Sequence, residues 1–130
     1  MGKFIIGESD FGIGSCECEL DLENLKIHKL EIIGDENAFE SLKGQEAFEF
    51  RYYPISLPDF YLINAPVLKD GNSYKAQVNI GFKSRCDVGL EFSGDIELTG
   101  AIDITEGIFT YKGEAEIYEE KYALDIEAKL

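Results

Sequence analysis

The feature that most constrains the fold is a two-residue alternation of apolar and polar side chains from residue 74 to the end of the chain. Successive side chains of a strand point to opposite faces, so this period predicts strands with one buried face. Only short turn-like sequences separate the segments, which permits antiparallel neighbours and excludes the long crossovers of parallel pairing. The buried set comprises Tyr74, Ala76, Val78, Ile80 and Phe82; Ile96, Leu98, Gly100, Ile102 and Ile104; Phe109, Tyr111, Gly113, Ala115 and Ile117; and Tyr122, Leu124, Ile126, Ala128 and Leu130.

The earlier part of the chain predicts further strands. Turn residues at 70–73 predict a hairpin between the apolar stretch 60–68 and the strand that starts at Tyr74. Residues 16–22 alternate with an acidic outer face, and residues 46–53 have the composition of a strand. Residues 25–33 fit a strand or a helix, and a strand is the preferred interpretation.

One short helix is expected near residues 35–43. Asp35 is an N-cap candidate, Phe39 and Leu42 are three residues apart, and Gly44 stands where a C-terminal cap belongs. The chain is long enough for one core only, so it predicts a single domain, 1–130. The fold class expected is mainly β, all-β or α+β, with an antiparallel meander forming a curled sheet, sandwich or small barrel.

Charge restricts the class of partner. The chain has 26 acidic and 12 basic side chains and a formal net charge of −14. Residues 1–50 hold twelve acids and four bases, residues 51–90 three and five, and residues 91–130 eleven and three. This excess disfavours nucleic acid and anionic membrane, whose phosphates need matched Lys and Arg. With neither an apolar run of membrane-spanning length nor a signal-peptide pattern, we expect a cytoplasmic protein.

Most of the acids fall on the outward half of the alternation. Like charges across neighbouring strands destabilise a sheet, so such a face gains from a cationic partner. A solvated surface without a partner is the alternative interpretation. The outward carboxylates predicted to bind a partner are Glu97, Asp103, Glu114, Glu116, Asp125 and Glu127, and the outward set near the start of the chain is Glu17, Glu19 and Asp21.

Residues 51–66 hold all three prolines, four aromatic side chains and two charges. Proline removes a backbone donor, so this stretch is not expected to form one regular central strand. It is interpreted as an anchor for a partner, with Tyr53 or Tyr61 buried on binding, as the lip of a ligand cavity, or as an edge strand that covers the core.

Residues that carry catalysis or bind metals are few. Cys16, Cys18 and Cys86 form an odd set without the usual zinc-ligand spacing, so they are interpreted as small core residues. His28, the only imidazole, has no nucleophile motif beside it. The glycines of residues 7–14 lack the Lys-Ser/Thr pair of a phosphate loop and predict a turn or a bulge. We therefore expect no enzymatic activity, no metal and no cofactor.

The leading interpretation is a small acidic binding protein. In size and charge the chain resembles bacterial immunity proteins and nuclease inhibitors, which cover a cationic active site. We expect an immunity-type inhibitor that neutralises a basic protein, a toxin or a nuclease, by occluding its cationic site. The alternative is a β-barrel-like carrier of a small apolar ligand, with residues 60–66 at its mouth. Association of copies through a sheet edge is a third possibility, and the oligomeric state is left open.

Overall fold

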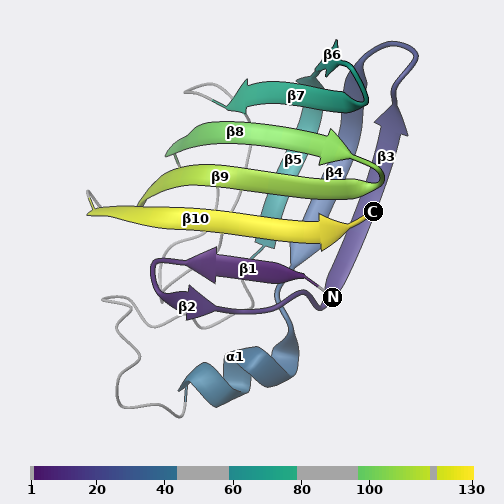
Figure 1. Cartoon of the computed structure of the whole chain (residues 1–130). Coiled ribbons are helices and arrows are strands. Elements are labelled where there is room, and N and C mark those ends of the chain that lie inside the picture. The colour runs from purple at the N-terminus through teal and green to yellow at the C-terminus, as the bar shows by residue number, and fades with distance from the viewer. Residues whose placement is uncertain (1, 44–58, 79–96, 118–119) are drawn as a thin grey trace.

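The computed structural model describes residues 2–43, 59–78, 97–117 and 120–130, which form two antiparallel sheets and a short helix (Figure 1). The elements in chain order are β1 (Lys3–Ile6), β2 (Ser9–Asp10), β3 (Ser15–Asp21), β4 (Lys26–Ile33), α1 (Glu36–Lys43), β5 (Asp59–Pro66), β6 (Leu68–Asp70), β7 (Ser73–Val78), β8 (Glu97–Thr105), β9 (Ile108–Ile117) and β10 (Glu120–Lys129).

The larger sheet has seven strands in the order β2-β1-β10-β9-β8-β7-β6. Its later strands pair with their neighbours in sequence, which confirms the predicted meander. The turn between β8 and β9 has positive φ angles at Glu106 (52°) and Gly107 (76°), the conformation that a two-residue hairpin turn requires. The two ends of the chain meet in this sheet because β1 pairs with β10, with Phe4 opposite Ile126.

The smaller sheet has three strands in the order β3-β4-β5. The ambiguous stretch 25–33 forms the strand β4, as preferred from the sequence. A register shift places Ile27 opposite Leu20 and Lys29 opposite Glu19, so His28 is the extra residue of a bulge. The bulge places Ile27 and Leu30, which are three positions apart, on the same buried face of β4. A spacing of three between buried residues is typical of a helix, which accounts for the ambiguity.

The predicted helix near residues 35–43 is α1. The Asp35 carboxylate accepts a hydrogen bond of 2.9 Å from the Ala38 backbone N–H, as an N-cap residue does. On its inner side Phe39 is buried, and its ring lies 6.4 Å from that of Phe11. No helix in the described part of the chain has the length and apolarity to cross a bilayer.

The core lies between the two sheets, whose strands run in different directions in Figure 1. Phe60 from the smaller sheet packs on Tyr111 and Phe109 of the larger one, with ring centroids 5.2 and 6.0 Å apart. The described strands do not close into a barrel, and within the expected fold class they form a sandwich of two sheets. These aromatic rings occupy the interior where a carrier would need space for an apolar ligand.

The stretch that begins at Asp59 is divided between the two sheets. β5 pairs with β4 and buries Phe60 and Leu62, so the edge-strand interpretation is confirmed for this part of the proline-rich segment. β6 belongs to the larger sheet and forms the predicted hairpin with β7. Predictions for residues 46–53 and 79–96, including Tyr53, lie outside the described residues.

Candidate protein-binding surface

The outer face of the larger sheet carries four of the carboxylates that the alternation predicted, Asp103, Glu114, Asp125 and Glu127. On β10, Asp125 and Glu127 alternate with the buried Leu124, Ile126 and Ala128. Glu114 is exposed on β9, and Asp103 is half-buried on β8. Glu97 and Glu116 are opposite each other in the register of β8 and β9. The residues predicted to bind a partner therefore lie on one sheet, except Tyr61 on β5 and Tyr53.

Lysines of the same chain share this face with the acids. The Nζ of Lys3 lies 3.0 Å from Oδ2 of Asp125, and this hydrogen bond and charge raise the pKa of Lys3. In the strand register Lys3 is also opposite Glu127, and Lys112 is opposite Asp125. The face is therefore mixed in sign, and part of its negative charge is neutralised within the molecule.

Asp103 is bound into a local polar network. Its Oδ2 accepts a hydrogen bond of 3.0 Å from the Thr105 hydroxyl, which lies 2.6 Å from the hydroxyl of Ser73. The Oδ1 atoms of Asp103 and Asp125 are both buried and have no hydrogen-bond partner among the described residues. These two carboxylates are therefore less available to a partner than Glu114, which is opposite the uncharged Ala123 and Thr99.

A second acidic row lies on the outer face of β3. Ser15, Glu17 and Glu19 are exposed and Asp21 is half-buried, while the intervening Cys16, Cys18 and Leu20 turn toward the core. The Glu17 side chain is 71% exposed, and its Oε2 lies 3.6 Å from Nζ of Lys29 on β4. Every charged residue of β3 is acidic, so we name Glu17, Glu19 and Asp21 the β3 acidic row.

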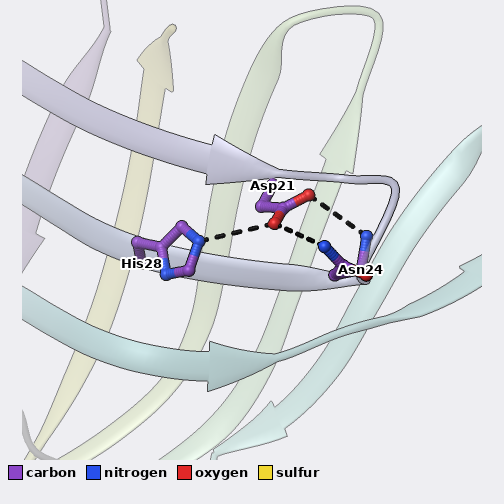
Figure 2. Close-up of polar contacts among 3 residues, drawn as sticks. All are labelled: Asp21, Asn24 and His28. Carbon is purple, nitrogen blue, oxygen red and sulfur yellow. Dashed lines mark hydrogen bonds and ion pairs between the residues drawn. The ribbon is translucent and has the colours of Figure 1, made fainter.

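The turn after β3 orders the last member of this row (Figure 2). The Asp21 carboxylate accepts hydrogen bonds from the Asn24 side chain at 2.8 Å and its backbone N–H at 3.2 Å. Its Oδ2 also lies 3.5 Å from Nε2 of His28, the bulge residue of β4. These contacts, led by the side-chain hydrogen bond from Asn24, lower the pKa of Asp21 because they favour its ionised form.

Tyr61 belongs to the same outer face as the β3 acidic row. The strand register aligns Glu17 on β3, Glu31 on β4 and Tyr61 on β5, and Tyr61 is half-buried. Tyr61 therefore shares this outer face, two strands away, with a carboxylate row that is not among the six acids predicted to bind a partner. The signal for that row was present in the sequence, because Glu17, Glu19 and Asp21 alternate without an intervening lysine.

The thiols of β3 are packing residues in the described structure. Cys16 and Cys18 are free and half-buried, and they pack against the core without belonging to it, so the prediction of small core residues holds only in part. Cys86 lies outside the described residues. Burial raises the pKa of both thiols, which keeps them protonated at neutral pH. The described residues contain no group of three or more His, Cys, Asp or Glu side chains placed to hold a metal.

Comparisons with family models, curated proteins and solved structures found no match for this chain. The function is therefore argued from the charges and edges of the two sheets.

Proposed function

We propose that this protein binds a basic protein partner and acts as an immunity-type inhibitor that occludes the partner's cationic site. The observation that carries the proposal is the β3 acidic row, three carboxylates on a strand that has no basic residue. The net charge of −14 adds a long-range attraction for a basic protein. Attraction of this kind accelerates association and weakens as salt screens it.

The geometry of the row supports occlusion. Carboxylates two residues apart in a strand are spaced by roughly 6.6 Å, so each can contact a different Lys or Arg of the partner. A nuclease site that binds phosphates presents several such cations, and carboxylates that bind them exclude the substrate. Tyr61 lies on the same outer face as the row, in register with Glu17 through Glu31. The exposed Glu114 and Glu127 lie on the outer face of the other sheet, across the core from the row.

The test is capture of the partner by the wild-type chain and by two matched double variants. Glu17→Gln with Glu19→Gln removes two charges from the β3 acidic row, and Glu114→Gln with Glu127→Gln removes two from the other sheet. Each immobilised protein is exposed to lysate of the source organism at about 50 mM and about 300 mM salt, concentrations between which screening increases strongly. Quantitative mass spectrometry identifies the retained proteins.

We expect a basic protein that the wild type retains at the lower salt and releases at the higher salt. Retention falls more for the β3 variant than for the matched variant. Purified partner is then assayed for its own activity, which should disappear at one equivalent of the wild-type chain. Absence of any enriched basic protein, or capture that is indifferent to salt, would refute the proposal.

A further inference from the structure

β3 has one paired edge and one open edge. Its ladder with β4 includes all seven of its residues, and no other described strand pairs with its opposite edge. Figure 1 shows β3 at the margin of the fold. The bulge next to it belongs to β4, so β3 keeps the regular backbone on which another strand can pair. An open edge presents unpaired N–H and C=O groups to another chain.

The two faces of β3 define which strand would fit this edge. On the inner face, Cys16, Cys18 and Leu20 are only half-buried, whereas Leu30 and Ile32 beside them on β4 are fully buried. Apolar surface therefore remains to be covered at the open side of β3. On the outer face, Glu19 and Asp21 of the β3 acidic row are opposite the basic Lys29 and Lys26 of β4, whereas Glu17 is opposite Glu31. No described strand pairs on the other side of the row.

We propose that the open edge of β3 is the docking site for an extended segment of a basic protein, which adds to the smaller sheet as a fourth strand. Lys or Arg side chains of the segment lie beside Glu17 and Glu19, and small apolar side chains between them cover Cys16 and Cys18. The inference rests on the proposed function and names its site. Addition of a strand to a sheet edge is a general mode of peptide recognition.

Charge disfavours a second copy of this chain as the occupant. An antiparallel pair of β3 strands centred on Cys18 would place Glu17 of each copy opposite Glu19 of the other. Like charges directly opposite one another destabilise a strand pair. A basic segment has the reverse effect, because it continues the alternation of sign that starts with Lys29 opposite Glu19.

The test uses a peptide of alternating Lys and Val with the length of β3. Binding is followed by calorimetry, by the amide resonances of the protein and by hydrogen exchange at the β3 amides. We expect resonance shifts and slowed exchange within β3. We also expect affinity to fall at least tenfold in Glu17→Gln with Glu19→Gln, and much less in Glu114→Gln with Glu127→Gln.

Two N-methylated forms of the peptide separate strand addition from simple charge attraction. Methylation of every Val amide, or of every Lys amide, removes the donors of one peptide edge and leaves the charge unchanged. Strand addition requires that at least one form lose affinity tenfold or more. If both forms bind like the parent, or if the parent peptide does not bind, the inference is overturned. A salt-dependent basic partner captured by the wild-type chain would in that case still support the proposed function.

Discussion

Replacement of Phe60 by alanine tests whether the two sheets share one core. Phe60 is 1% exposed and contacts rings of two strands of the opposite sheet, so truncation leaves a cavity that neither sheet can fill alone. Phe-to-Ala changes at such positions cost about 3–5 kcal/mol of unfolding free energy. In a chain of this size that lowers Tm by roughly 10–25 °C. Ile108→Ala, at a residue 43% exposed, is the control and should cost about 0.5 kcal/mol or less.

The assay is urea unfolding followed by far-ultraviolet circular dichroism, since the chain has no tryptophan. A double-mutant cycle with Tyr111→Leu isolates the contact between the sheets, and an aromatic pair of this kind should show a coupling of roughly 0.5–1.5 kcal/mol. A cost below about 1 kcal/mol for Phe60→Ala, or strictly additive effects of the two changes, would refute the packing of one sheet on the other.

Three further outcomes are expected. The folded state lowers the pKa of Asp21 from its ordinary value of 3.8, so its stabilising effect is present above that pH and is lost as the pH falls through the lowered pKa. Asn24→Ala should raise this pKa, and a carboxyl NMR titration that shows no rise would contradict the assignment. Cys16 and Cys18 should react with iodoacetamide more slowly in the folded than in the unfolded chain, because burial raises the pKa of both thiols. Peptide mapping measures the alkylation rate of each thiol in the two states, and equal rates in the two states would count against burial. Gly100→Ala should lower the free energy of unfolding in urea by about 1–3 kcal/mol, because the alanine Cβ would lie 2.5 Å from the Lys112 carbonyl oxygen. An unchanged unfolding midpoint would show that β8 and β9 can move apart to accept the methyl group without losing stability.

The strands with local signals could be predicted from the sequence. The period of two was sufficient for β7 to β10, and the short turn-like sequence between Ile104 and Phe109 contains the turn between β8 and β9. The bulge at His28 could not be predicted, because it depends on how β4 pairs with β3 and not on its own residues. The division of the stretch 60–68 between two sheets has the same origin, since pairing with distant strands decides it.

The outward direction of the acids was predictable, but their neutralisation was not. Alternation shows that Asp125 faces outward, and only the pairing of β1 with β10 shows that Lys3 lies beside it. These two residues are at opposite ends of the chain, so no local pattern relates them. A count of charges by region therefore overestimates the negative field on the larger sheet.

Topology also decides which carboxylates keep a side available to a partner. In the interior of a sheet each outward residue has a neighbour on both sides, and the chain's own lysines fill such positions beside Asp125. A residue of an edge strand has a neighbour on one side only. Glu17 and Glu19 are of this second kind, since the described ladder of β3 reaches only β4. For an acidic β protein, the carboxylates of an open edge are therefore better candidates for a cationic partner than those at the centre of the most acidic face.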